Sequence, residues 1–238
     1  MKGLKFGALV MSACMLLSSC GMSNTGKGSL IGAGGGAALG TLIGGLAGKG
    51  KGAAIGAAVG TAVGVTTGAI IGKRMDKAKA AAQQVENAQV ETVTDNNGLE
   101  AVKVTFDSGI LFTTGSSTLS NNATAALAKF ASTVLNTNRD MDVAIMGYTD
   151  NQGWKNSTAE QSAQKNITLS QQRANAVSNY LTQCGVLNTQ IASVQGLGEA
   201  NPVADNSTAA GQAQNRRVEV YLYASKAMIE AAQAEAGN

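Results

Sequence analysis

Arg173 is the residue whose type and position point most clearly to chemistry. It lies three residues after Ser170, which we expect to be the N-cap of a helix that runs to Gly185. A cation in the first helical turn opposes the helix dipole by about 0.3–1 kcal/mol, whereas the free N–H groups at that end suit an anion. Because a guanidinium binds a carboxylate through two parallel hydrogen bonds, this position predicts an anionic ligand shared by Arg173 and the helix terminus.

The remaining composition narrows the possible functions. The chain has no histidine, the commonest general base and metal ligand. Its net charge of +3 falls to +1 without residues 1–19 (16 basic against 15 acidic residues), so no clustered basic face points to nucleic acid. Cys184, alone in the C-terminal half, is interpreted as a small buried side chain. Since no GxSxG, P-loop or metal-spaced cluster occurs, we expect no enzyme, no cofactor and no metal site.

The elements that must position Arg173 form a mixed domain. Residues 89–94 and 99–106 alternate apolar and polar side chains around Asn96-Asn97-Gly98, which is typical of a hairpin. Helical spacing of apolar residues predicts an amphipathic helix over 119–137. Apolar runs predict three further strands, at 143–146, 191–196 and 218–222. Two helices interleaved with strands predict an α+β fold with the helices on one face of the sheet.

The N-terminus has the layout of a signal peptide. Residues 1–19 join a basic start to a short apolar core and small residues, and the core is too short to span a bilayer. The tetrad Leu17-Ser18-Ser19-Cys20 resembles a bacterial lipobox, which predicts lipidation (palmitate) at Cys20; an ordinary secretory signal is the alternative. Each buried acyl CH₂ contributes about 0.8 kcal/mol, so two or three chains would anchor the protein firmly. Gly21 in place of Asp favours sorting to the outer membrane.

Glycine occupies every fourth position from Gly28 to Gly72, with apolar residues between. Lys49 and Lys51 mark a turn between two arms of about twenty residues, a length that suits a bilayer. Small residues at this spacing let helix backbones approach closely in lipid, whereas in water so much glycine would weaken a helix. We therefore expect a membrane-associated glycine-zipper helical hairpin over 28–73; a flexible low-complexity spacer is the alternative.

Three motifs follow in order in the C-terminal half. They are Ile145-Met146-Gly147-Tyr148-Thr149-Asp150, then Asn166-Ile167-Thr168-Leu169-Ser170-Gln171-Gln172-Arg173-Ala174, and finally Gly196-Leu197-Gly198-Glu199 with Pro202 and Asn215-Arg216-Arg217-Val218-Glu219. Together they resemble the OmpA-like peptidoglycan-binding domain over about residues 99–224. With the lipobox and the glycine ladder, the whole chain is similar to OmpA-family lipoproteins of the YiaD type. The resemblance implies a β-α-β-α-β two-layer domain with a mixed sheet.

The resemblance also implies the ligand, the meso-diaminopimelate of the peptidoglycan stem peptide. At the matching positions Asp150 would take the ligand's ammonium and Arg173 its carboxylate. Thr149 and Asn166 would add hydrogen bonds, and Arg216 would close the pocket. Opposite charges at fixed spacing suit a zwitterionic amino-acid centre. An Asp150–Arg173 salt bridge without a ligand is the alternative interpretation.

Other residues near these motifs leave choices open. Asn215 precedes Arg216 and is included in the expected peptidoglycan-binding site. For Arg216 and Arg217 the alternative is surface charge on an edge strand, and we expect ligand contact from Arg216 only. The stretch 151–165 is longer than the usual family loop, so it either folds over the pocket as a lid or loops outward. Gln212 stands where the family often has arginine.

These observations predict a division of the chain and a function. The expected parts are a signal peptide (1–19), a lipidated tether (20–27), the zipper hairpin (28–73), a linker helix (74–94), the OmpA-like domain (95–225) and a C-terminal tail (226–238). The expected function is an outer-membrane lipoprotein, its C-terminal domain in the periplasm, that tethers the membrane to peptidoglycan. One alternative is a membrane-active or homo-oligomeric zipper protein that the wall domain only positions. A wall hydrolase would need two poised carboxylates, and Asp150 and Glu160 are the only nearby acids.

Overall fold

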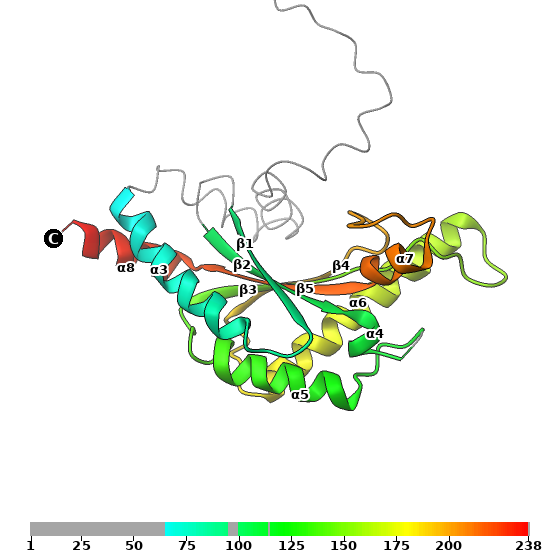
Figure 1. Ribbon diagram of the computed structural model, residues 1–238, viewed down its shortest axis with the longest axis horizontal. Coiled ribbons are helices and arrows are strands. Elements are labelled where there is room, and N and C mark those ends of the chain that lie inside the picture. The colour runs from blue at the N-terminus through cyan, green and yellow to red at the C-terminus, as the bar shows by residue number, and fades with distance from the viewer. Residues whose placement is uncertain (1–64, 95–99, 114, 238) are drawn as a thin grey trace, which may run out of the picture. The chain divides into compact units, whose positions relative to one another are not determined.

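The computed structural model describes residues 65–94, 100–113 and 115–237. The expected signal peptide, Cys20 and all of the glycine ladder before Val65 lie outside the described residues. The described elements are α3 (Val65–Ala82), β1 (Ala88–Thr94), β2 (Glu100–Asp107), α4 (Ser108–Leu111), α5 (Asn121–Phe130), the π-helical turn η2 (Ala131–Leu135), β3 (Met141–Gly147), α6 (Ala159–Gln183), β4 (Ile191–Gly196), α7 (Ala209–Asn215), β5 (Arg217–Ala224) and α8 (Lys226–Ala236) (Figure 1).

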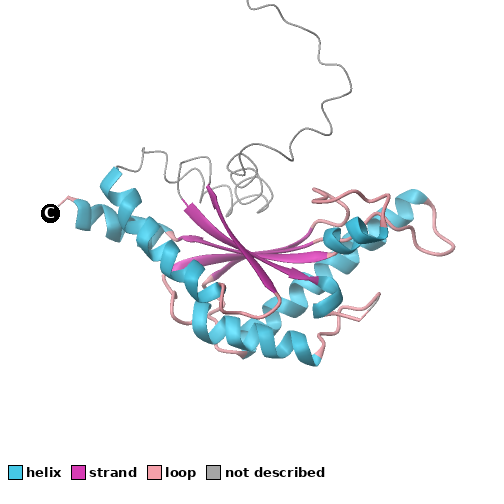
Figure 2. Ribbon diagram, in the orientation of Figure 1, coloured by secondary structure: helices cyan, strands magenta, loops and turns pink. Residues whose placement is uncertain are grey.

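The sheet is mixed, with the strand order β1-β2-β5-β3-β4. β3 and β4 are parallel, and the other neighbours are antiparallel. Alternate residues of the strands, such as Val104, Ile145 and Val220, share one hydrophobic core with side chains of α3, α5, α6 and α8. Figure 2 shows these helices and the sheet as separate layers. The predicted α+β fold, with core helices on one sheet face, is confirmed.

α6 begins earlier than the sequence pattern predicts. Its N-cap is Thr158, and a capping box joins the side chains and backbones of Thr158 and Gln161. Ser170 therefore lies inside the helix, where its hydroxyl donates to the Ile167 carbonyl oxygen and accepts from the Gly198 N–H. The predicted N-cap at Ser170 is wrong, and Arg173 is far from the helix terminus. The helix dipole consequently does not contribute to an anion site there.

The expected linker and tail are both parts of the folded domain. α3 buries Ile71, Met75, Ala78 and Ala82 in the core, and β1 pairs with β2 along its full length. α8 buries Met228 and Ile229 and lies against α3 (Figure 1). The folded domain therefore extends beyond the boundaries predicted at residues 95 and 225. Alanine-rich helices give a weak apolar pattern, although the spacing of the four buried α3 residues is helical.

Two glycines set how closely α6 approaches the sheet. A Cβ on Gly147 would overlap the carbonyl oxygen of Ser170, and one on Gly196 would overlap the backbone of Gln171. The backbone of α6 therefore rests directly on the ends of β3 and β4, as glycine at a close crossing allows. This contact holds Arg173 beside the strand ends. Within the part of the chain described, none of the helices has the length and apolarity needed to cross a membrane.

Candidate functional site

Three neighbouring strands have a terminus at the same end of the sheet, where β2 and β3 end and β5 begins. β5 lies between β2 and β3, with Asp107 opposite Arg217 and Gly147 opposite Val218. The Ser108 N–H donates to the Arg216 carbonyl oxygen at 2.9 Å, which carries the alignment one residue further. Residues that follow β2, precede β5 and follow β3 are thereby brought together from distant parts of the sequence.

A cavity of about 730 Å³ lies at this end of the sheet, and we call it the strand-end cavity. Five of the six residues expected to bind peptidoglycan line it: Thr149, Asp150, Asn166, Arg173 and Arg216. Phe112, Leu169 and Trp154 supply apolar walls. The structure thus gathers the three motifs around one hollow with mixed polar and apolar walls, a common form for a small-molecule site.

Asp150 forms an ion pair with Arg216. Its Oδ2 lies 2.5 Å from Nη1 of Arg216, and its Oδ1 accepts from the Gln152 N–H at 3.2 Å. The alternative Asp150–Arg173 salt bridge is therefore not the one that forms. Arg216 also does not lie on an edge strand, because β5 occupies the centre of the sheet. Only about a third of its side chain is exposed.

Arg173 is a buried cation with no carboxylate in salt-bridge contact among the described residues. It is 3% exposed, its Nε donates to the Ser116 carbonyl oxygen at 3.0 Å, and its guanidinium lies 5.2 Å from the Phe112 ring centre. Burial and then the neighbouring Arg216 lower the pKa of Arg173, while Asp150 opposes this shift. The guanidinium nevertheless remains charged. A desolvated cation with only these partners favours an anionic ligand.

The charges around the cavity point the same way. Lys155, Arg173 and Arg216 line it with three positive charges, and Asp150 contributes one negative charge. The net lining charge is therefore +2. A carboxylate would be attracted to the cavity as a whole, while the single acid offers a place for one ammonium.

Asn166 lines the cavity, but its amide already has partners within the protein. Its Oδ1 accepts from Nε1 of Trp154 at 2.7 Å. Its Nδ2 donates to the Gln152 carbonyl oxygen at 3.2 Å and to Oε1 of Glu199 at 2.9 Å. In this state Asn166 holds the neighbouring loop in place rather than offering a free hydrogen bond to a ligand.

Asn215 lies outside the lining of the cavity. It is fully buried, its Oδ1 accepts from the Val203 and Ala204 N–H groups, and its Nδ2 donates to Ala204 and Asn206 oxygens. Four hydrogen bonds fill the capacity of its amide. Asn215 therefore does not contact the cavity as expected. Instead it holds the 203–206 loop in place, and it directly precedes Arg216 in the chain.

Arg217 anchors the start of β5. Its side chain donates to Oε1 of Glu219 and to the carbonyl oxygens of Asn215 and Asn201, and its guanidinium lies 3.8 Å from the Tyr148 ring centre. It is 3% exposed, so the interpretation as surface charge is wrong for it. As expected, it does not line the strand-end cavity.

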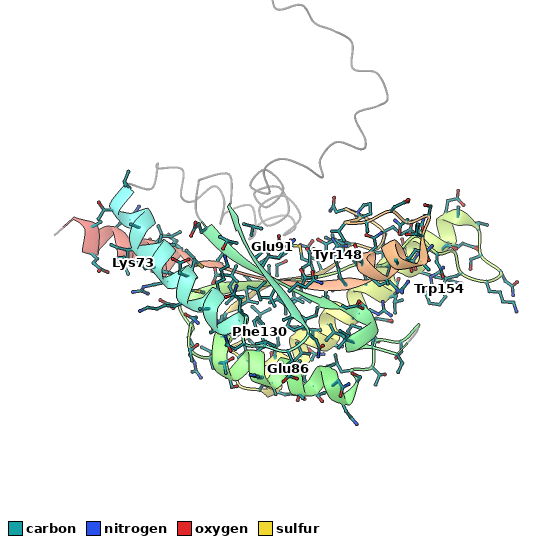
Figure 3. All side chains as sticks on the ribbon, in the orientation of Figure 1. Lys73, Glu86, Glu91, Phe130, Tyr148 and Trp154 are labelled. Carbon is teal, nitrogen blue, oxygen red and sulfur yellow. The ribbon has the colours of Figure 1, made fainter. Side chains whose placement is uncertain are left out.

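The long segment 151–165 divides into two parts. Residues from Ala159 onward belong to α6, while Gln152 to Lys155 line the cavity. The Trp154 N–H donates to Oγ of Ser162 at 3.0 Å, and Nε2 of Gln152 donates to Oε1 of Gln212 at 2.9 Å. Gln212 therefore ties this loop to α7, the helix near which Trp154 is labelled in Figure 3. Of the two expectations, folding over the cavity fits better.

Sequence reasoning missed two kinds of residue at this site. Trp154 falls within the stretch 151–165, where no pattern singles it out, and Ser108 belongs to none of the three motifs. Ser108 and Thr149 both line the cavity, and their hydroxyl oxygens are buried and have no hydrogen-bond partner among the described residues. The available signal was position, since Ser108 comes two residues after the end of the predicted strand 99–106. No group of three or more metal-ligating side chains occurs in the part of the chain described.

Comparison with known proteins identifies families that match this chain. The OmpA family matches residues 111–216, and the YMGG-like Gly-zipper matches residues 1–76. "Probable lipoprotein YiaD" of Escherichia coli is 38% identical over 222 residues, which are 91% of this chain and 93% of that protein. "Peptidoglycan-binding protein ArfA" of Mycobacterium tuberculosis is 48% identical over 83 residues, which are 35% of this chain and 23% of that protein.

The fold is also known from a solved structure. A MotB-like protein from Desulfovibrio vulgaris has a TM-score of 0.56 at 22% identity, over 67% of this chain and 97% of that one. At this identity the likeness concerns the fold alone. The OmpA family comprises structural, non-enzymatic proteins of the cell envelope. The family match over residues 111–216 and the relative that is 38% identical over 91% of this chain show that the chain belongs to the OmpA family, as a member whose OmpA-type domain follows a YMGG-like glycine zipper.

Proposed function

We propose that the strand-end cavity binds peptidoglycan non-covalently through the diaminopimelate of its stem peptide. The observation that carries this proposal is the buried Arg173, which has no carboxylate partner among the described residues and lies in the same cavity as Asp150. Diaminopimelate brings a carboxylate and an ammonium on one carbon. The two lining charges of opposite sign are complementary to that pair. The name of the mycobacterial relative, a peptidoglycan-binding protein, supports the same ligand.

The charges assign the two ends of the ligand. A carboxylate would meet the terminal nitrogens of Arg173, because Nε is occupied by Ser116. The ammonium would meet Asp150, which it has to share with Arg216. The methylene chain between the two amino-acid centres would lie against Phe112, Leu169 and Trp154, where its burial adds apolar contact.

We further propose that the protein tethers the outer membrane to the wall. Lipid chains on Cys20 and the zipper over 28–73 would hold one end in the membrane, with the domain in the periplasm. A relative named "Outer-membrane lipoprotein YfiB" of Pseudomonas aeruginosa, 34% identical over 115 residues, supports this placement. Modest affinity at each site suffices, because many copies bind one polymer and avidity increases the total.

The glycine zipper favours a second candidate function. A match to the YMGG-like Gly-zipper over residues 1–76 is consistent with helices that assemble several copies, with the wall domain only positioning them. Comparing the oligomeric state in detergent with and without residues 26–64 tests this. The deletion should stop at residue 64, because α3 begins at Val65 and belongs to the folded domain.

Co-sedimentation with purified sacculi tests the leading proposal. Asp150→Ala and Arg173→Ala should each abolish most of the pelleting, with the circular dichroism spectrum unchanged. Arg139→Ala is the matched control, because Arg139 is exposed, makes one hydrogen bond to the Asn136 carbonyl oxygen and does not line the cavity. If the Asp150 and Arg173 variants pellet like the Arg139 variant, the cavity is not the binding site.

A further inference from the structure

Ser108 carries a hydroxyl that the folded protein does not use. The residue is 2% exposed and lines the strand-end cavity, and its Oγ has no hydrogen-bond partner among the described residues. A buried hydroxyl without a partner destabilises a fold, and almost all such groups in proteins find one. A group kept in that condition beside a cavity is suited to a partner that arrives from outside.

The backbone fixes where this hydroxyl lies. Ser108 comes directly after β2 and is the first residue of α4, whose N-cap is Asp107. The N–H of Ser108 bonds to the Arg216 carbonyl oxygen at 2.9 Å. Ser108 is therefore held beside the backbone of Arg216 at the strand-end cavity, which Arg173 and Leu169 of α6 also line.

The cavity holds a second hydroxyl of the same kind. Thr149 is 4% exposed, and its Oγ1 also has no partner among the described residues. Within the described part of the chain, the other two buried side-chain atoms without partners are on Asn136 and Gln190, which do not line the cavity. Ser108 follows β2 and Thr149 follows β3, so the two hydroxyls approach the cavity from either side of β5.

We propose that Ser108 is a ligand-binding residue, and that its hydroxyl and that of Thr149 donate hydrogen bonds to a side-chain carboxylate of the bound amino acid. This inference rests on the proposed function and deepens it. The carboxylate is the group by which diaminopimelate differs from lysine, the diamino acid with a single carboxyl group. Ser108 thus becomes a residue that determines which stem peptide is selected. Rotation about its Cα–Cβ bond is the movement that turns the hydroxyl toward the ligand.

The surroundings favour a carboxylate over an ammonium at this position. The Ser108 N–H donates a hydrogen bond to the Arg216 carbonyl oxygen, and Arg216 and Arg173 both line the cavity with positive charge. An ammonium beside Ser108 would be repelled by these two groups, and the one lining acid, Asp150, already offers it a better place. A carboxylate would receive hydroxyl donors in addition to guanidinium groups, and hydrogen bonds to a charged group are the stronger kind.

Ser225 is the matched control. It does not line the cavity, and its hydroxyl accepts from the Met228 N–H at 3.1 Å as the N-cap of α8. Ser225→Ala should therefore lower stability, as the loss of an N-cap does, and leave ligand binding unchanged. Ser108→Ala should show the opposite pattern, with binding weakened and stability unchanged or increased.

The experiment measures binding of two tripeptides to the mature full-length chain in detergent. The first is L-Ala-γ-D-Glu-meso-diaminopimelate, and the second has L-Lys in the third position. For the first, Ser108→Ala should raise the Kd about tenfold, as the loss of one hydrogen bond to a charged group implies. For the second, Ser108→Ala should leave the Kd within about twofold. Thr149→Val, which keeps the side-chain shape, should repeat both results and provides a second variant should Ser108→Ala fail to fold.

The outcomes separate the two proposals. If the unmodified chain does not bind the diaminopimelate tripeptide, the proposed function fails and this inference fails with it. If the unmodified chain binds but Ser108→Ala and Thr149→Val bind equally well, the proposed function stands and the role of the hydroxyls is refuted. Equal weakening for both tripeptides would also refute it, because the hydroxyls would then not read the carboxylate.

Discussion

Nη1 of Arg216 and Oδ2 of Asp150 lie 2.5 Å apart, so an ion pair joins the residue before β5 to the segment after β3. The pair lies at the strand-end cavity and is only partly exposed, at 36% for Arg216 and 9% for Asp150. The ion pair therefore joins two segments that are distant in the sequence at the strand-end cavity.

This pair predicts energetic coupling between its two residues. Arg216→Gln and Asp150→Asn should each lower the free energy of unfolding by about 1 kcal/mol, a modest value because water reaches Arg216. The double variant should be no less stable than the weaker single variant, since the second change removes a partner that is already lost. Urea unfolding of all four proteins measures the cycle. Strictly additive losses would show that the two side chains do not interact in solution.

Trp154 provides a direct optical signal for the site. It is the only tryptophan of the chain and lines the strand-end cavity, with its indole N–H fixed on Asn166. Adding the diaminopimelate tripeptide should shift its fluorescence in a saturable manner, because the ligand replaces water near the indole. The signal should vanish in Arg173→Ala. A signal that survives unchanged in that variant would place the tripeptide elsewhere.

Among the acidic residues of the sheet, Glu219 is the one whose substitution is expected to lower the free energy of unfolding most. Burial acts to raise the pKa of Glu219, but Arg217, Lys103 and the hydrogen bond from Tyr221 together hold it below its ordinary value. Glu219→Gln would leave Arg217 buried without its charge partner, so the free energy of unfolding should fall by about 3 kcal/mol. Urea unfolding measures the loss.

The exposed pair on α8 supplies the control for Glu219. Lys226 and Glu230 form an i,i+4 ion pair with more than half of each side chain exposed. Glu230→Gln should change stability by less than about 0.5 kcal/mol. Comparable losses for Glu219→Gln and Glu230→Gln would contradict the buried network.

Asp142 predicts an unusual dependence of stability on pH. Burial raises its pKa to about 6, above the value of about 4 in an unfolded chain. The folded protein therefore holds this proton more tightly, and the contribution of Asp142 to stability falls as pH rises from about 4 to about 6. Asp142→Asn should raise the urea midpoint at about pH 7.5 and leave it unchanged at about pH 3.5. Parallel profiles for the two proteins would exclude such a shift.

Glycines of the ladder and of the sheet should respond oppositely to alanine. A Cβ on Gly68 would meet nothing within 4 Å, and one on Gly72 would only touch Glu100 at 3.6 Å. Alanine at either position should stabilise α3 by about 1 kcal/mol through helix propensity. Gly147→Ala and Gly196→Ala should instead be strongly destabilising, because both would push α6 away from the sheet. Thermal unfolding of the four variants gives the comparison.

Much of the fold could be predicted because its signals are local. β1 and β2 alternate apolar and polar residues, and β3 and β5 carry continuous or alternating apolar runs. The start of α6 could not be found in this way. Its first turns carry mostly polar residues, so no apolar stripe marks them. Ser170, a residue type that often caps helices, therefore led to the wrong predicted start. The capping box of Thr158 and Gln161 was the local signal that should have been preferred.

The residues that form the site could be predicted from the motifs, but not which of them form ion pairs. The motifs identified Asp150, Arg173 and Arg216 as neighbours, and the cavity contains all three. Which arginine pairs with Asp150 depends on the register of β5 against β3, which sets Val218 opposite Gly147. No local pattern encodes that register. The same holds for Asn166, whose amide is occupied by the Trp154 loop.

α3 has a mechanical consequence for the proposed tether. Gly68 and Gly72 are the last glycines of the ladder, yet the helix that carries them also anchors Ile71 and Met75 in the core and lies against α8. A force applied at Val65 therefore acts directly on two packed helices, because no flexible linker lies between Val65 and α3. In the proposed tether the reach from lipid to wall would then depend on residues 20–64, and lengthening or shortening that stretch is the direct way to alter the spacing.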